Sequence, residues 1–316
     1  RVRALTRAVC ASHTRSAPWS PLRSLGRARA SRRPPSSPLR CLVSVRARKK
    51  RTRERDARPS PAARAMVAKS PCLGISLPLP GLEEPLVLSD GQYAAALTVS
   101  LLVGYAALRG WTERRLAGHP KRLNARSWLL TLLVSPWMFA CSVPALAEAR
   151  RRGWSEEWGY DESSVSRACV MGFVIYMVVD LAVGVVDYRK EIDPLSGWFH
   201  HIAYCAMLGY VCLKHQTKGF MPWLLEEAST VVLGLGRAQI YRNDWLTGAS
   251  FFAVRVVFHA YMQYVWWVAF VAPGSQHFAW YYYLCTPAGL LNCKWMLDWC
   301  RGQQKRMRKA AAAKRR

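Results

Sequence analysis

The chain has 316 residues, enough for one large domain or two small ones, and carries 46 Lys and Arg against 19 Asp and Glu. Residues 1–65 hold 19 of these basic residues and only two acids, Glu54 and Asp56. No aromatic pattern or folded pattern accompanies the arginines, so the charge is weak evidence for nucleic-acid binding, and we expect no nucleic-acid partner.

The basic segment 1–65 is rich in Arg, Ser, Pro and Ala and has too few apolar residues to offset the entropy of ordering, so it is predicted to be disordered. Three interpretations stay open. It is a leader upstream of a start at Met66, an organelle transit peptide, or a functional basic tail. Residues 66–90 are predicted to be a linker.

The remainder predicts an all-α polytopic membrane domain over residues 91–300, because a bilayer core of about 30 Å needs roughly 20 mostly apolar helical residues. Seven segments approach that length, and the fifth is the least apolar because it contains two glutamates. The predicted spans are 92–109, 127–148, 166–187, 197–215, 219–237, 249–271 and 278–300.

Basic residues in short loops predict the orientation. The loop after the first span and the tail 301–316 are strongly basic, which favours a lumenal or external start of the first span and a cytosolic C-terminus. Arg150 to Arg152 would then lie on the opposite side, partly offset by nearby acids. The tail is typical both of a stop signal and of a surface that attracts anionic lipids.

Ionisable groups inside the predicted spans are numerous, although each costs about 2.5–3.5 kcal/mol on insertion, so they are expected to face the bundle interior. His200 and His201 open the fourth span, and Asp187, Arg255 and Glu227 are predicted to lie near the same depth. The sequence therefore predicts one buried site that opens toward the cytosol. Its candidate catalytic residues are His200, His201 and Glu227, and its candidate lipid-binding residues are Tyr176, Asp180, Asp187, Trp198, Tyr204, Glu226, Thr230, Arg255 and Asn292.

Structural roles compete for several of these residues. Glu227 and Arg255 suit a salt bridge, Asp187 suits the membrane boundary beside Arg189, and Asn292 suits a hydrogen bond between helices. The ten cysteines form no CxxC pair or His/Cys cluster at zinc spacing, so no metal, disulfide or resident cofactor is predicted.

Seven short motifs between Tyr176 and Met296 together resemble the TLC domain, which ceramide synthases share with several non-synthase relatives. They are Tyr176 with Asp180, Asp187 to Lys190, Trp198 to Ile202, Glu227 to Thr230, Arg237, Phe251 to Arg255, and Leu291 to Met296. The resemblance covers about residues 90–300. It implies a six-helix core, here with one added helix, around a lipid-binding cavity with the double histidine near its polar end.

In ceramide synthases the double histidine and a following H-D-x-x-D motif serve acyl transfer from acyl-CoA to a sphingoid amine. The double histidine is present, but Glu226, Glu227 and Thr230 stand where that second motif would have its His and two Asp. The chain is therefore more similar to the smaller TLC-domain proteins linked to membrane lipid homeostasis. A domain of this kind does not fix the activity by itself.

We expect an integral membrane protein of lipid homeostasis that binds an acyl lipid and is a candidate for remodelling it. One alternative is an acyltransferase that uses His200 as base or nucleophile, Glu227 to orient it, and Arg255 to hold an anionic group, with acyl-CoA as co-substrate. Others are a non-enzymatic lipid or cargo carrier with membrane-protein partners, and an ion or proton pathway. We expect the protein in the endoplasmic reticulum or another endomembrane. The alternatives are the plasma membrane, and a mitochondrion or plastid if residues 1–65 are a transit peptide.

Overall fold

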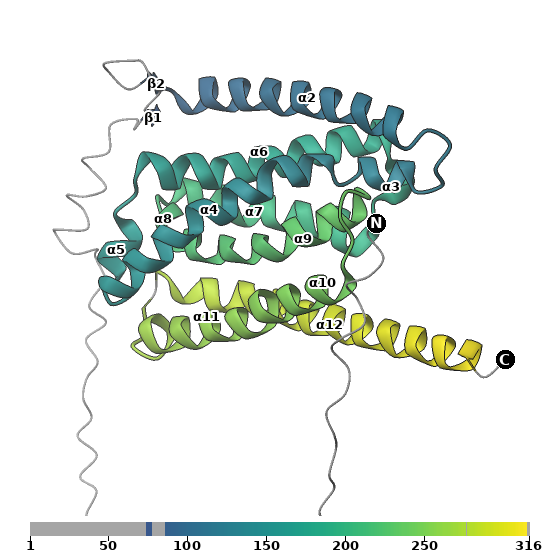
Figure 1. The fold of residues 1–316 in the computed structure, drawn as a ribbon. Coiled ribbons are helices and arrows are strands. Elements are labelled where there is room, and N and C mark those ends of the chain that lie inside the picture. Colours follow the sequence, from purple (N-terminus) through teal and green to yellow (C-terminus); the bar gives the residue numbers. More distant parts are fainter. Residues whose placement is uncertain (1–73, 78–85, 276, 315–316) are drawn as a thin grey trace, which may run out of the picture. The chain divides into compact units, whose positions relative to one another are not determined.

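Helices account for most of the part of the chain that the computed structural model describes, which is residues 74–77, 86–275 and 277–314 (Figure 1). The segment 1–65, and with it the interpretations of its role, lies outside these residues. The longer helices are α2 (Asp90–Arg115), α4 (Leu129–Arg151), α6 (Ser164–Asp187), α7 (His200–Leu213), α9 (Glu227–Arg237) and α12 (Ala279–Lys314). The shorter ones are α3 (Arg122–Arg126), α5 (Glu156–Tyr160), α8 (Thr217–Phe220), α10 (Asp244–Phe251) and α11 (His259–Trp266).

Three of the regions predicted as spans are helical but not uniformly α-helical. A π-helical turn, Pro194–Phe199, leads into α7, and a 3₁₀ turn, Met221–Glu226, joins α8 to α9. Two further π-helical stretches, Phe252–Phe258 and Trp267–Val271, flank α11. Wider and narrower turns of this kind often occur at functional sites or hinges.

Three helical segments have the length and apolar composition to cross a membrane, namely α2, the α3–α4 region Arg122–Arg151, and α6. The structure is therefore compatible with an all-α membrane protein, whereas seven spans stay a prediction. Three of the other four regions fall short for local reasons, whereas the seventh lies in the long helix α12. The helix α7 has 14 residues, fewer than the roughly 20 that a bilayer core needs, and irregular turns interrupt the fifth and sixth regions.

Local sequence explains where the first helices begin. Ser89 caps α2 by accepting from the amide of Gln92, and the Gln92 side chain accepts from the amide of Ser89 in return. Ser163 and Ser166 cap α6 in the same reciprocal way. Such boxes satisfy amides that a helix leaves unpaired at its start. A short antiparallel pair, β1 (Ile75–Leu77) with β2 (Leu86–Leu88), precedes α2.

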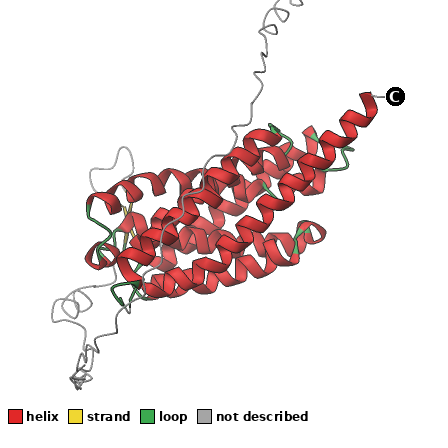
Figure 2. Cartoon of the chain, turned by 90° about the horizontal axis from the view of Figure 1, so that it is seen from below, coloured by secondary structure: helices red, strands yellow, loops and turns green. Residues whose placement is uncertain are grey.

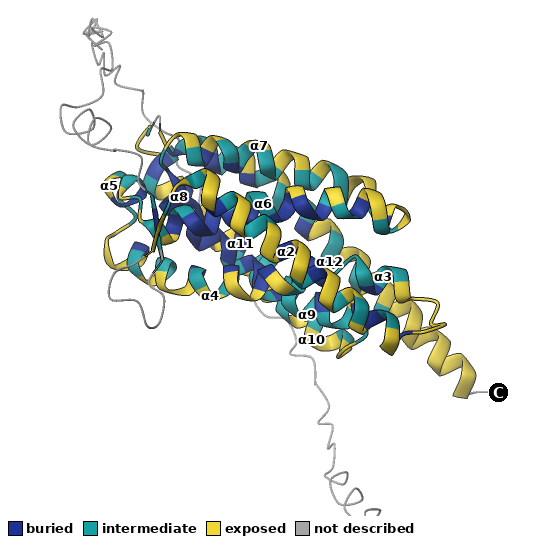
Figure 3. Ribbon diagram, turned by 90° about the horizontal axis from the view of Figure 1, so that it is seen from above, coloured by how far each residue is buried: buried dark blue, intermediate teal, exposed yellow. Residues whose placement is uncertain are grey.

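The helices pack side by side in a bundle, with α2 at one edge and α10, α11 and α12 at the other (Figures 1 and 2). Between these edges, α6 packs against α2 and α7, and α4 packs against α9 and the turn Met221–Glu226. Large apolar side chains are also exposed, among them Val186, Leu213 and Leu290, at 87%, 79% and 69%. Exposed positions recur along the outer helices of the bundle (Figure 3). Exposed apolar helix faces around a polar interior are typical of a protein whose solvent is lipid.

The two ends of the bundle differ in charge. At the end that holds α5 and α8, called here the balanced end, basic residues lie among an equal number of acids. Three of these basic side chains form ion pairs there: Arg152 and Lys218 with Glu148 and Asp161, and Arg167 with Asp90 and Glu162. The residues counted are Arg150, Arg151, Arg152, Arg167, Lys214 and Lys218 against Asp90, Glu148, Glu156, Glu157, Asp161 and Glu162.

The opposite end, called here the basic end, holds α3, the loop after α6, the loop after α9 and the extension of α12 beyond the other helices (Figures 1 and 3). Contacts tie these parts together. Arg126 pairs with Asp187 at 2.9 Å, Arg115 donates to the carbonyl of Gln239 at 2.8 Å, and Arg306 pairs with Asp244. Residues 299–314 contain six basic residues and no acid.

Candidate functional site

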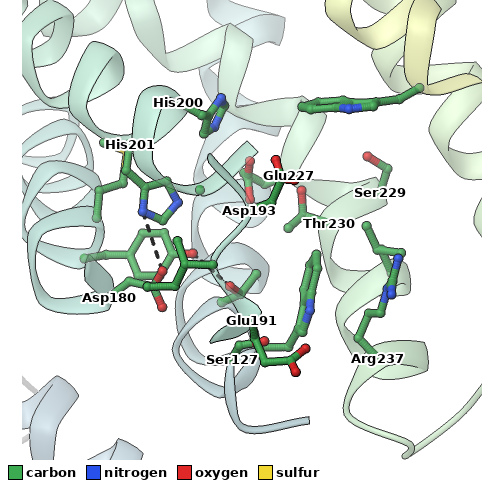
Figure 4. Close-up of a pocket in the computed structure, with 18 of the residues that line it drawn as sticks. Ser127, Asp180, Glu191, Asp193, His200, His201, Glu227, Ser229, Thr230 and Arg237 are labelled. Carbon is green, nitrogen blue, oxygen red and sulfur yellow. Dashed lines mark hydrogen bonds and ion pairs between the residues drawn. The ribbon is translucent and has the colours of Figure 1, made fainter. Parts of the chain in front are cut away.

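A cavity of about 490 Å³ lies between α4, α6 and α7 on one side and α9, α10 and α12 on the other (Figure 4). Aromatic side chains form much of its lining: Trp128, Phe173, Tyr176, Tyr188, Phe251, Trp295 and Trp299. Polar groups from segments far apart in the sequence project into it as well. A volume of this size falls within the range of about 300–1,000 Å³ that is usual for ligand sites.

One wall of the cavity carries the double histidine. His200 and His201 begin α7, where the π-helical turn Pro194–Phe199 ends. The Nδ1 atom of His201 lies 3.5 Å from Oδ2 of Asp180, and the Tyr188 hydroxyl donates to the other Asp180 oxygen at 2.6 Å (Figure 4). Asp180 is therefore fixed by Tyr188 and faces His201 without a hydrogen bond to its Nδ1 atom.

His200 has a different environment from its neighbour. Its ring lies 4.4 Å from the ring of Tyr204 and 5.7 Å from that of His201, measured between centroids. Among the described residues it makes no hydrogen bond, and it is half-buried at the cavity edge. Its ring nitrogens are therefore open to a ligand, whereas His201 already faces a carboxylate.

The opposite wall carries a buried ion pair. Glu227 accepts from the Ser135 hydroxyl at 2.6 Å and from Nη2 of Arg255 at 3.2 Å. The same Arg255 nitrogen donates to the Thr230 hydroxyl at 2.7 Å, and Nε donates to the Ser229 hydroxyl at 3.3 Å. The structural alternative raised from the sequence, a Glu227–Arg255 salt bridge, is thus what the structure contains. Glu227 is not hydrogen-bonded to His200, so the predicted orientation of His200 by Glu227 is absent.

A second polar network lies behind the ion pair. Glu226 pairs with Nδ1 of His259 at 2.6 Å, and the amide of Asn292 donates to Glu226 at 3.4 Å. The other ring nitrogen of His259 lies 3.1 Å from the carbonyl oxygen of Cys285. Both ring nitrogens of His259 are therefore in contact with polar groups of neighbouring segments. Tyr204 and Glu226 line a small adjoining cavity of about 30 Å³.

The structure brings most of the sequence-predicted residues together. The main cavity is lined by Tyr176, Asp180, His200, His201, Glu227, Thr230 and Arg255. Tyr204, Glu226 and Asn292 belong to the network behind it. Asp187 and Trp198 line neither cavity. Asp187 is held by Arg126, by Arg109 at 3.1 Å and by the Tyr105 hydroxyl, and its position at a membrane boundary stays a prediction.

Several residues at or beside the cavity were not among the candidate site residues. Ser135, Tyr188 and Ser229 fix the charged groups described above, and Glu191 and Arg237 line the part of the cavity nearest the basic end. Ser135 lies beside Pro136 within an apolar stretch, and a small polar residue in that position is a usable signal for an interior helix face. Arg237 belongs to the motifs that resemble the TLC domain, whereas Glu191 lies at a predicted loop boundary and gives no signal.

The cavity thus contains two histidines that could act as acid or base and one ion pair, Glu227 with Arg255, among aromatic side chains. Among residues 74–77, 86–275 and 277–314, no group of three or more His, Cys, Asp or Glu is placed to hold a metal ion. Comparison of the chain with protein-family models, curated proteins and solved structures found no match. The resemblance to the TLC domain therefore rests on its motifs and stays a prediction.

Proposed function

We propose that this chain is an integral membrane protein of TLC type that binds an acyl lipid in the cavity between its helices and acts in membrane lipid homeostasis. The observation that carries the proposal is the convergence of His200, His201, Glu227 and Arg255, from three separate helical segments, on one cavity of about 490 Å³. Ionisable groups held inside apolar helices cost insertion energy, which favours a functional role for them.

The lining of the cavity favours an amphiphile as its ligand. The mostly apolar walls, with their aromatic side chains, suit an acyl chain, while the histidines and the neighbouring hydroxyls suit a polar group. The apolar helices α2, α4 and α6 are compatible with a bilayer around the protein, which is such a ligand's own environment. A cavity with this lining inside apolar helices is sufficient for a protein that carries or senses a membrane lipid.

The charge difference between the ends supports the predicted orientation. Positive charge concentrates on the cytosolic side of membrane proteins, and here it concentrates at the basic end, to which the cavity extends through Ser127, Glu191 and Arg237. We therefore propose that the cavity opens toward the cytosol and that the extension of α12 lies there. An endomembrane such as the endoplasmic reticulum is the compartment that the TLC resemblance implies.

Acyl transfer is the second candidate function, and the contact between His201 and Asp180 favours it. With Asp180 fixed by Tyr188, His201 would act as the base, and His200 would contact the substrate. Ceramide synthesis is the less well supported form of acyl transfer. Glu226, Glu227 and Thr230 stand in place of the H-D-x-x-D motif, and Glu227 is already paired with Arg255.

The test has two parts. Purified protein in detergent is incubated with a photoreactive fatty acyl lipid, and labelled peptides are mapped with and without unlabelled competitor. Labelling of α4, α7 or α9 next to the cavity supports the proposal, and saturable labelling that avoids these helices contradicts it. Leu233→Trp, which places a large side chain at the cavity wall, is expected to reduce cavity labelling.

Cells that lack the protein are then rescued with wild type, His200→Ala or His201→Ala, and their lipids are compared by mass spectrometry. His119→Ala, an exposed histidine outside the cavity, is the matched control. Binding without turnover, and lipid profiles that depend on the cavity residues, support a carrier or regulator. A product released in a purified single-turnover assay and lost in His201→Ala supports the acyltransferase instead.

A further inference from the structure

Two charged side chains that line the cavity have no partner of opposite charge among the described residues. Arg237, at the end of α9, is exposed, and its guanidinium lies 6.0 Å from the ring centre of Trp128. No described carboxylate forms an ion pair with it. Glu191, in the turn after α6, accepts a hydrogen bond from the neutral Asn124 amide at 2.8 Å and pairs with no described basic side chain.

Three other charged groups of the lining, Arg255, Glu227 and Asp180, already have partners inside the protein. Arg255 is neutralised by Glu227 at 3.2 Å and lies 3.8 Å from Glu226. Asp180 accepts from Tyr188 and faces His201. Arg255, which the sequence suggested as the holder of an anionic group, is therefore already occupied, and Arg237 is the better placed cation for that task.

Arg237 and Glu191 come from opposite sides of the cavity, on α9 and on the turn after α6, and both lie toward the basic end (Figure 4). Among the lining residues shown, His200 lies on the opposite side from Glu191 and Arg237 (Figure 4). A ligand with a single negative group would satisfy Arg237 and face Glu191 with like charge. A purely cationic ligand would do the reverse. A headgroup that carries both signs complements both residues.

We propose that the polar end of the cavity selects a zwitterionic phospholipid headgroup, with the phosphate bound by Arg237 and the ammonium group bound by Glu191. Arginine is suited to phosphate because its planar fork of donors matches two phosphate oxygens. The rings of Trp128 and Trp299, which also line the cavity, offer faces that attract an ammonium group. This inference rests on the proposed function, since it assumes that an acyl lipid occupies the cavity.

The experiment compares five ligands that share one sixteen-carbon chain and differ only in the headgroup. They are lysophosphatidylcholine, lysophosphatidylethanolamine, lysophosphatidic acid, hexadecyltrimethylammonium and monoacylglycerol. Affinities for the full-length protein in nanodiscs are measured by competition against a fluorescent lysolipid. The variants are Arg237→Gln and Glu191→Gln, with Arg114→Gln and Glu157→Gln as controls, because both control residues are exposed and outside the cavity.

The two variants are expected to fail on different ligands. Arg237→Gln should weaken the three phosphate-containing ligands by about tenfold and leave the trimethylammonium ligand unchanged or tighter. Glu191→Gln should weaken the two zwitterionic ligands and the trimethylammonium ligand by about the same factor, while lysophosphatidic acid binds as well or better. The two control variants should change none of the five affinities.

The outcomes separate this inference from the function on which it rests. One contrary result is that all five ligands bind, that Leu233→Trp weakens all of them, and that Arg237→Gln and Glu191→Gln behave like their controls. The cavity would then bind acyl chains without selecting the headgroup, and the inference is wrong. If lysophosphatidic acid binds most tightly and Glu191→Gln has no effect on any ligand, the site is anionic-selective and the inference is again wrong. If none of the five competes in the wild type, both the inference and the proposed function fail.

Discussion

The Glu227 carboxylate and the Arg255 guanidinium meet at 3.2 Å inside the bundle, and their side chains are only 11% and 13% exposed. The residues come from α9 and from the π-helical stretch Phe252–Phe258, so the pair joins the fifth and sixth helical regions. Ser135 on α4 and Thr230 on α9 hydrogen-bond to the same two groups. The pair therefore links three helical regions at the wall of the cavity.

Removing one partner of this pair should destabilise the fold. Arg255→Met leaves Glu227 buried without a cation at hydrogen-bond distance, and a buried pair broken in this way costs about 3–5 kcal/mol. The double variant Glu227→Gln with Arg255→Met should recover part of that loss, because neither charge is then left alone. Thermal unfolding in detergent measures both. Lys294→Met, which breaks an exposed pair with Asp298, is the control and should cost less than about 1 kcal/mol.

The hydrogen bond between Tyr188 and Asp180 gives a second prediction. Tyr188→Phe removes the donor 2.6 Å from the buried carboxylate, and a hydrogen bond to a charged group contributes about 1.5–3 kcal/mol. The variant should lose stability in that range, and Tyr241→Phe, on an exposed tyrosine, should not. A double-mutant cycle with Asp180→Asn isolates the pair. Additive effects of the two substitutions would mean that Tyr188 does not hold Asp180.

Hydropathy was sufficient to place the helices of this protein, and insufficient to describe their interior. The residues of each predicted span fall in helical structure, but α7 is only 14 residues long and two π-helical stretches flank α11. Apolar composition indicates the length of a segment that avoids water. It does not report the switch from α-helical to π-helical or 3₁₀ turns, which depends on packing against neighbouring helices.

The same limit explains which parts of the site were missed. Sequence spacing correctly grouped His200, Glu227 and Arg255 at one cavity. The predicted pairing of Glu227 with His200 was wrong, because Glu227 contacts Arg255 and Ser135, and the carboxylate nearest the double histidine is Asp180, which faces His201. The 3₁₀ turn Met221–Glu226 rotates about 120° per residue instead of the α-helical 100°, so side-chain directions at its junction with α9 do not follow from helical spacing.

Close packing of α12 against α11 predicts the effect of a single added methyl group. A Cβ atom at Gly289 would lie 2.7 Å from Nε2 of His259, whose ring is fixed by Glu226 and the carbonyl of Cys285. Gly289→Ala should therefore cost about 1–3 kcal/mol as an overpacked substitution. Gly209→Ala on α7, where nothing lies within 4 Å, should instead stabilise the helix by about 0.5–1 kcal/mol. Chemical denaturation in detergent compares the two, and equal effects would contradict the packing described here.

The charge difference between the two ends predicts which loops face the lumen. Gly118 and Gly153 both lie in exposed turns with positive φ, of 73° and 69°, at the basic and the balanced end respectively. An Asn-Gly-Thr acceptor on a flexible linker, inserted after one or the other, should be N-glycosylated only after Gly153, because basic loops stay on the cytosolic side. A mobility shift removed by glycosidase reports the modification in cells. Glycosylation after Gly118 alone would reverse the orientation and place the mouth of the cavity, with Arg237 and Glu191, on the lumenal side. A shift for both insertions would mean that these two ends do not lie on opposite sides of one membrane.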